Sequence, residues 1–154
     1  MIRLGKLTDY GIVLVTYMAR SDHGPLHTAR DLAAAAQLPL PTVSKLLKEL
    51  SQGGVLTSHR GVKGGYSLAR TPQEISVAQI IAALEGPIGM TECAASEPGL
   101  CDLEPHCPLP TNWRVISHAV RDALEKVTVA DLISTSPLIA AKDLPLTQIS
   151  GRTQ

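Results

Sequence analysis

Apolar residues recur with helical spacing along several stretches of the chain, and breaks that contain Pro or Gly separate these stretches. The first stretch covers residues 7–20, where apolar side chains return every three or four positions. The second, RDLAAAAQ at 30–37, is rich in Ala, the strongest helix former. Thr28 stands three residues before Asp31, which is the spacing of a capping box at the start of a helix. The pattern therefore predicts two helices, the second beginning after Thr28.

A third helix is expected directly after a short turn that contains proline. In residues 42–52 the apolar positions fall at i, i+3, i+4 and i+7, and Pro41 suits the first position of a helix. Gly53 and Gly54 end the stretch. Two short helices around a tight turn are typical of a helix-turn-helix, whose second helix offers its N-terminal residues to the DNA major groove. Any helical hairpin shares this pattern, so it is not specific alone.

The next stretch predicts a β-hairpin with basic residues in its loop. Residues 55–59 and 66–70 each have the composition of a short strand, and Arg60-Gly61-Val62-Lys63-Gly64-Gly65 joins them. The glycines permit a tight turn. Arg60 suits a narrow minor groove, and Lys63 suits a phosphate. A basic hairpin directly after a helix-turn-helix indicates a wing, and we call residues 55–70 the wing.

Two further helices complete the pattern. Ser76 and Gln79 form a capping box for a helix over 77–84, which Gly86-Pro87 ends. Thr111 is expected to cap a helix that runs to about residue 127, and VADLIS continues or ends it. Its apolar residues repeat at intervals of 3, 4, 3 and 4, a heptad seam formed by Trp113, Ile116, Val120, Ala123 and Val127.

This seam favours pairing of two copies of the chain. The run is too short for an isolated coiled coil, and the small domain before it offers little surface to cover it. A second copy would bury the seam around a two-fold axis, giving a homodimer. Two-fold symmetry also suits a protein that reads two half-sites on double-stranded DNA.

Composition adds a division of charge to this picture. The chain has 154 residues and a formal net charge of zero, but residues 1–70 hold nine Lys and Arg against four acids, and residues 71–154 hold five against ten. The first part therefore carries about +5 and the second about −5, which indicates that the first part contacts a polyanion. No apolar run approaches the roughly 18 residues of a membrane span. We expect a soluble, cytoplasmic protein.

All three cysteines of the chain fall in one acidic loop, residues 86–110, which we call the cysteine loop. Three thiols cannot all pair within one chain, and an odd cluster in a protein without a secretory signal favours metal or redox ligation over disulfides. No Lys or Arg occurs between Arg70 and Arg114. Several thiolates among carboxylates would repel one another unless a cation lay between them. The alternative is a flexible acidic loop with three unligated thiols.

These segments resemble the winged-helix iron–sulfur regulators that include IscR, NsrR and RirA, and most closely the regulators of the SUF cluster-assembly system. The wing motif RGxxGGYxLAR and the three-cysteine loop are specific in combination. The resemblance covers nearly everything from Met1 to about Ser134, in KLTDYGIVLVTYMAR, LPLPTVSKLLKEL, SHRGVKGGYSLAR, ISVAQIIAALEGPI with TEC, and NWRVISHAVRDALEKVTVADL. It implies a homodimeric transcription factor, a repressor of cluster-assembly genes, whose DNA affinity depends on an iron–sulfur cluster.

The resemblance also implies a set of site residues. The cluster, 2Fe-2S or 4Fe-4S, would be held by Cys93, Cys101 and Cys107. IscR-like members add a His three residues after the last cysteine, where this chain has Pro110. NsrR-like members use an Asp near the start of the first helix, supplied by the partner subunit, and Asp9 matches it. His106 and Glu104 are local alternatives. The expected DNA-contacting residues are Thr28, Thr42, Ser44, Lys45, Lys48, Arg60 and Lys63.

The expected architecture is mainly α with a small β-hairpin wing, a winged helix-turn-helix followed by a long dimerisation helix. The boundaries are 1–85 for the DNA-binding domain, 86–110 for the cysteine loop, 111–134 for the dimerisation helix and 135–154 for a loosely ordered tail. Three alternatives remain: a nitric oxide, iron or redox sensor of the same fold, a structural Zn²⁺ held by the cysteines with His106, and an electron carrier or enzyme. No nucleotide-type glycine loop or Ser/His/Asp motif supports an enzyme, and no small-molecule substrate is expected.

Overall fold

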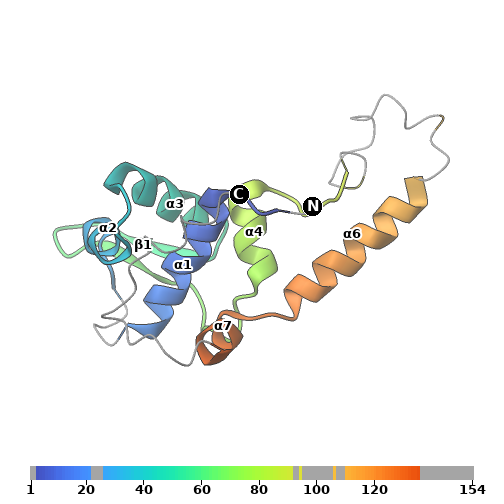
Figure 1. Cartoon of the computed structure of the whole chain (residues 1–154). Coiled ribbons are helices and arrows are strands. Elements are labelled where there is room, and N and C mark those ends of the chain that lie inside the picture. The colour runs from blue at the N-terminus through green and yellow to red at the C-terminus, as the bar shows by residue number, and fades with distance from the viewer. Residues whose placement is uncertain (1–2, 22–25, 92–93, 95–105, 107–109, 136–154) are drawn as a thin grey trace, which may run out of the picture.

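The computed structural model describes residues 3–21, 26–91, 94, 106 and 110–135. Within them the chain forms helices and one two-stranded antiparallel sheet, which confirms the expected mainly helical fold with a hairpin (Figure 1). No helix of the described residues is long and apolar enough to cross a membrane. The elements are α1 (Lys6–Arg20), α2 (Ala29–Ala36), α3 (Leu40–Gln52), β1 (Leu56–His59), β2 (Gly65–Leu68), α4 (Val77–Glu85), α6 (Pro110–Glu125) and α7 (Val129–Thr135).

Side-chain caps set the starts of α2 and α4 where the sequence predicted them. The hydroxyl of Thr28 accepts a hydrogen bond from the backbone N–H of Asp31 at 3.1 Å. Ser76 and Gln79 form a complete capping box, with side-chain contacts to each other's backbone N–H of 3.3 and 3.2 Å. Pro41 is the second residue of α3 rather than the first, because Leu40 already has helical geometry after Pro39. Pro39 and Pro41 lack a backbone N–H, but they cost the helix no hydrogen bond, because the first N–H groups of a helix have no partner within it.

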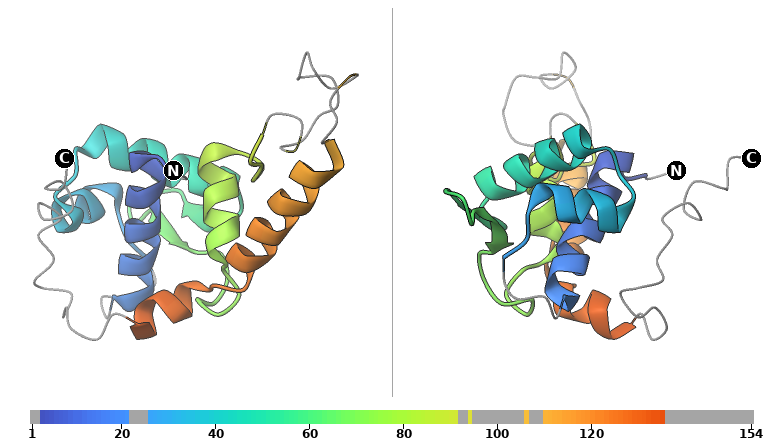
Figure 2. Two further views of the ribbon diagram at one scale, coloured as in Figure 1. Left: turned by 45° about the vertical axis from the view of Figure 1, so that its right-hand side comes forward. Right: turned by 90° about the vertical axis from the view of Figure 1, so that its left-hand side faces the viewer.

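The core lies where α1, α2 and α3 meet, and α4 and α7 close it from the other side (Figure 2). The buried face of α3 is the predicted one, with no accessible surface on Val43, Leu46, Leu47 and Leu50. Aliphatic side chains supply nearly all of this packing, as a chain without Phe requires. The fully buried residues include Leu14, Val15, Leu32, Val43, Leu46, Leu47, Leu50, Val55, Ile75, Ile80 and Val129.

The region expected as one dimerisation helix, 111–134, contains two helices. α6 begins at Pro110, so Thr111 lies inside it and does not cap it. After Glu125 the chain turns, and Thr128 starts α7 by accepting from the backbone N–H of Asp131 at 3.2 Å. α7 packs on α1, whereas α6 extends away from the body beyond its contact with α4 (Figures 1 and 2).

Candidate nucleic-acid interface and cysteine loop

A tight turn joins α2 to α3 and makes the helix-turn-helix. Gln37 ends α2 in the left-handed conformation (φ 53°, ψ 37°), where its N–H donates to the carbonyl oxygen of Ala34 at 3.3 Å. The N–H of Leu38 donates to the carbonyl of Ala33 at 3.1 Å. Three residues therefore suffice to reverse the chain before α3. The turn places the N-terminal end of α3 beside the C-terminal end of α2.

The predicted contacts on α3 fall on its solvent side. Ser44, Lys45 and Lys48 are exposed and lie opposite the buried face of the helix, and Thr42 is half-buried on the flank. Lys45 Nζ lies 3.8 Å from Glu49 Oε1, an exposed pair of the kind that contributes little to stability. The side chain of Lys45 can therefore move from Glu49 to a phosphate at small cost.

The hairpin of the wing is paired in the register Leu56 with Leu68 through His59 with Gly65. Its strands are shorter than the predicted 55–59 and 66–70, although residue 65 belongs to the second strand. Arg60 and Lys63 lie in the connecting loop and are both exposed. The hairpin loop extends beyond α2 and α3 in the right-hand view of Figure 2. The wing therefore presents two cations at its end.

A third extended segment is paired with β2 near the loop of the wing. His27 pairs with Tyr66 through two backbone hydrogen bonds, His27 N to Tyr66 O at 2.8 Å and Tyr66 N to His27 O at 2.7 Å. Gly65 lies so close that a Cβ there would be 2.6 Å from the carbonyl oxygen of His27. Because Thr28 follows His27 and caps α2, the wing and the helix-turn-helix are joined directly. Their relative orientation is set before any DNA is bound.

The charge of this surface is strongly positive. Between residues 40 and 70 the chain has five Lys and Arg, and Glu49 is the only acidic residue. Such a surface attracts the phosphate backbone, with an affinity that falls as salt rises. The structure thus brings six of the predicted contact residues onto two elements, α3 and the wing, and Thr28 to the start of α2.

Most of the predicted cluster ligands lie outside the described residues, namely Cys93, Cys101, Cys107 and Glu104. Of the candidate fourth ligands, His106 is exposed and Asp9 lies half-buried in the first turn of α1. Within the part of the chain that the structure describes, the Asp9 carboxylate forms no hydrogen bond or ion pair. Thiols and one carboxylate are donor types that suit an iron–sulfur cluster with one oxygen ligand.

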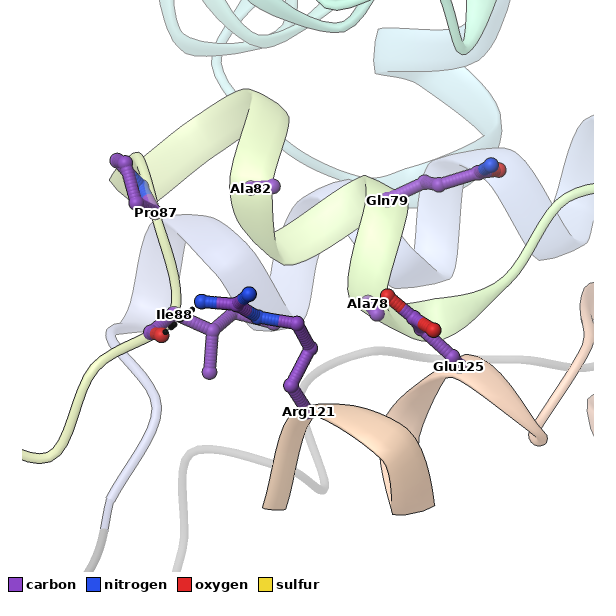
Figure 3. Close-up of a pocket in the computed structure, with 7 residues that line it drawn as sticks. All are labelled: Ala78, Gln79, Ala82, Pro87, Ile88, Arg121 and Glu125. Carbon is purple, nitrogen blue, oxygen red and sulfur yellow. Dashed lines mark hydrogen bonds between the residues drawn. The ribbon is translucent and has the colours of Figure 1, made fainter. Parts of the chain in front are cut away.

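The first residues of the cysteine loop, 86–91, are held against α6. The guanidinium of Arg121 donates to the carbonyl oxygen of Ile88 at 3.1 Å (Figure 3). The buried hydroxyl of Ser117 accepts from the N–H of Met90 at 3.0 Å. This segment closes one end of a groove of about 400 Å³ between α4 and α6, lined by Ala78, Gln79, Ala82, Pro87, Ile88, Arg121 and Glu125.

Glu85, the last residue of α4, connects the start of the cysteine loop to the start of α1. Its Oε1 accepts from the backbone N–H of Gly5 at 3.0 Å and from the hydroxyl of Thr8, which is buried. The sequence does not indicate this role of Glu85, because nothing in its local pattern points to a partner about 80 residues away. Only its position at the predicted helix end, beside Gly86, was visible in the sequence. Through this contact α4 is joined to the helix turn that carries Asp9.

Comparison with known proteins identifies the chain. The sequence pattern of the Rrf2 family, described as an iron-dependent transcriptional regulator, matches residues 4–135. The chain belongs to the Rrf2 family. Like its relatives, it is therefore a DNA-binding transcriptional regulator and not an enzyme.

Several Rrf2 relatives cover most of the chain. An HTH-type transcriptional regulator of Mycobacterium tuberculosis is 31% identical over 85% of this chain and 81% of its own. NsrR of Shouchella clausii is 28% identical over 86% and 89%, and IscR of Pectobacterium carotovorum is 29% identical over 90% and 85%. In structure, CymR of B. subtilis, a global cysteine regulator, is 26% identical with a TM-score of 0.63, covering 88% and 99%. The resemblance to IscR- and NsrR-like regulators is thus confirmed at the family level.

Proposed function

We propose that this Rrf2 regulator is a cytoplasmic homodimeric repressor of iron–sulfur cluster assembly genes, whose operator affinity depends on a bound cluster. The observation that carries the proposal is the combination of a basic winged helix-turn-helix with three clustered cysteines in a family described as iron-dependent. Relatives named IscR and NsrR support the same assignment.

On DNA, α3 enters the major groove and the wing lies along the adjacent minor groove. Ser44 and Lys45 lie near the N-terminal end of α3, where a recognition helix contacts base edges, with Thr42 at their flank. Lys48, Lys63 and the cap residue Thr28 are positioned for phosphates, and Arg60 for the narrow minor groove. The rigid contact of His27 with the wing keeps these two sets of contacts in register.

Cluster ligation falls to Cys93, Cys101 and Cys107, with Asp9 of the partner subunit as the fourth ligand. A bound cluster supplies a cationic centre that offsets the charge of the thiolates and is sensitive to iron supply and oxidation. The protein's part is to hold the start of the loop on α6, through Arg121 and Ser117, and to join it to α1 through Glu85. A change in the conformation of the cysteine loop would therefore be transmitted both to α6, the proposed dimerisation helix, and to the DNA-binding domain that contains α3.

The test compares operator binding by cluster-loaded and apo protein at one fixed salt concentration. We expect visible absorbance, iron and sulfide in protein purified without oxygen, and a change in DNA affinity of at least about tenfold when they are removed. The triple variant with Cys93, Cys101 and Cys107 replaced by Ser should be colourless and should bind as the apo form does. Equal affinities for loaded and apo protein would refute cluster sensing.

Asp9 favours a second candidate function, in which the same cluster senses nitric oxide or oxidants. The reason is that Asp9 matches the Asp that NsrR-like members use as the fourth ligand. Adding a nitric oxide donor to the loaded protein should then change operator affinity at concentrations too low to remove iron. A colourless protein with one equivalent of zinc would instead indicate a structural metal held with His106.

A further inference from the structure

Val62, at the end of the wing, has the most exposed large apolar side chain among the described residues. It is fully exposed, at 108%, whereas the next in order, Val115, is 63% exposed. A single exposed apolar residue is ordinary on a protein surface. Val62 differs because its whole side chain lies at the outer end of a hairpin, where all of its apolar surface is available for burial against a ligand.

The turn holds Val62 in this position. The backbone N–H of Gly64 donates to the carbonyl oxygen of Gly61 at 2.9 Å, which closes a four-residue turn with Val62 and Lys63 at its centre. Gly61 has φ +110°, a conformation that favours glycine, and a Cβ on Gly64 would collide with the carbonyl oxygen of His59. The direction of Val62 is therefore a fixed property of the loop.

The neighbours of Val62 direct it toward a polyanion. Arg60 and Lys63 flank it and are both exposed, and no Asp or Glu occurs between Glu49 and Glu74. In a DNA-binding regulator these cations bring the end of the wing to the duplex, and Val62 is brought there with them. At the protein–DNA surface a methyl group reads the sequence directly only where it meets a base edge in a groove.

We propose that Val62 is a specificity-determining residue that packs into the minor groove at A·T pairs and is excluded by the exocyclic amino group of guanine. The floor of the minor groove carries this N2 amino group only at G·C pairs. At A·T pairs the Val62 methyl groups would be buried against the sugars and the adenine edge, out of contact with water. At G·C pairs they would meet the amino group and displace its water without replacing the hydrogen bond. The inference rests on DNA binding by the wing and does not depend on the cluster.

The experiment uses full-length protein purified without oxygen and a duplex selected from a random-sequence pool. Replacing adenine by 2,6-diaminopurine adds the N2 amino group in the minor groove, and replacing guanine by inosine removes it. We expect one diaminopurine under the wing to weaken binding by the parent about five- to tenfold, measured by fluorescence anisotropy. Val62→Ala should weaken binding to the unmodified duplex by a similar factor and should respond little to the analogue.

Three controls separate this contact from electrostatics and from misfolding. Val62→Ile keeps an apolar side chain and should keep the response to diaminopurine. The analogue placed outside the protected region should have no effect on either protein. Lys63→Ala should reduce the slope of log affinity against log salt by about one, whereas Val62→Ala should leave the slope unchanged.

The inference is overturned if Val62→Ala binds as tightly as the parent, or if it keeps the full response to diaminopurine. It is also overturned if the variant loses binding to anionic phosphatidylglycerol vesicles while its DNA affinity is unchanged, which would assign Val62 to a lipid surface. Equal DNA affinity of loaded and apo protein refutes the proposed cluster sensing but leaves the Val62 result intact. The two proposals therefore fail on different measurements.

Discussion

At the scale of single residues, the close approach of Gly65 to His27 connects the wing to the rest of the DNA-binding domain. The side of Gly65 where a Cβ would stand faces the carbonyl oxygen and carbon of His27, at 2.6 and 3.0 Å. Next to this contact the backbones of His27 and Tyr66 exchange two hydrogen bonds. A residue with a side chain at position 65 must separate the two segments or distort the hairpin.

Gly65→Ala is expected to destabilise the protein by about 1–3 kcal/mol through this overpacking. It should also weaken operator binding, because the wing shifts relative to α3, while the salt slope stays that of the parent since no charge is removed. Urea unfolding and anisotropy titrations over several salt concentrations check both effects. Ser67→Ala, two positions along the same strand, loses only an exposed hydrogen bond to His59 and serves as the control. A Gly65→Ala protein with parental stability and affinity would contradict this account.

At the scale of elements, the boundary between α6 and α7 is set by one cap. Asp131 accepts from the N–H of Thr128 at 2.8 Å and from its hydroxyl at 2.7 Å, and these two bonds hold the pKa of Asp131 below its usual range. Backbone pairing supports the same turn, because the N–H of Val129 donates to Ile75 and that of Val77 to Val127. α7 is thereby placed on α1, where Arg20 donates to the carbonyl of Ile133 at 3.0 Å.

The cap should make stability depend on pH in a defined window. Since folding lowers the pKa of Asp131, the ionised carboxylate stabilises the fold above its unfolded pKa of about 3.9. This contribution is lost as the pH falls through the lowered folded pKa. The difference in unfolding free energy between the parent and Asp131→Asn should therefore be constant near neutral pH and shrink in acid. In a Thr128→Ala background, which lacks the hydroxyl, Asp131→Asn should change the unfolding free energy by less. If the free-energy difference between the parent and Asp131→Asn did not depend on pH, the cap would not have this role.

At the scale of the whole molecule, α6 presents apolar side chains that the described residues cover only in part. Trp113, Val115 and Ile116 are 36%, 63% and 43% exposed, and Ala119 and Ala123 on the same helix are also exposed. Such surface along an extended helix is typical of a protein interface. The proposed homodimer would bury it and would place two winged helices at the ends of one two-fold assembly.

Ile116→Glu is expected to place a charge in this interface and to shift the protein from dimer to monomer. Light scattering after size-exclusion chromatography should then give the mass of one chain, and operator affinity should fall because only one half-site contact remains. Glu125→Gln changes an exposed residue about 180° around the helix from Ile116, at the other end of α6, and should leave both properties as in the parent. A parent protein that is already monomeric when bound to its operator would contradict the proposed dimer.

The sequence by itself determined α1 to α4, the caps of α2 and α4, and the hairpin, because these depend on local spacing. The apolar period of 42–52, the Thr28 cap and the Ser76 and Gln79 capping box are all interactions within a few residues, so the pattern contained them. The same holds for the wing, whose glycines and basic residues form one continuous motif. The gathering of predicted DNA contacts on α3 and the wing followed from these elements and their order.

Only the tertiary structure decided how distant segments meet. The bridge between His27 and the wing, the contact of Glu85 with Gly5 and Thr8, and the packing of α7 on α1 join residues far apart in the chain. The break before α7 also depends on them, since Ile75 and Val77 pair with the turn that separates it from α6. Local spacing cannot predict such contacts, because their free energy comes from backbone and side-chain groups that folding alone brings together.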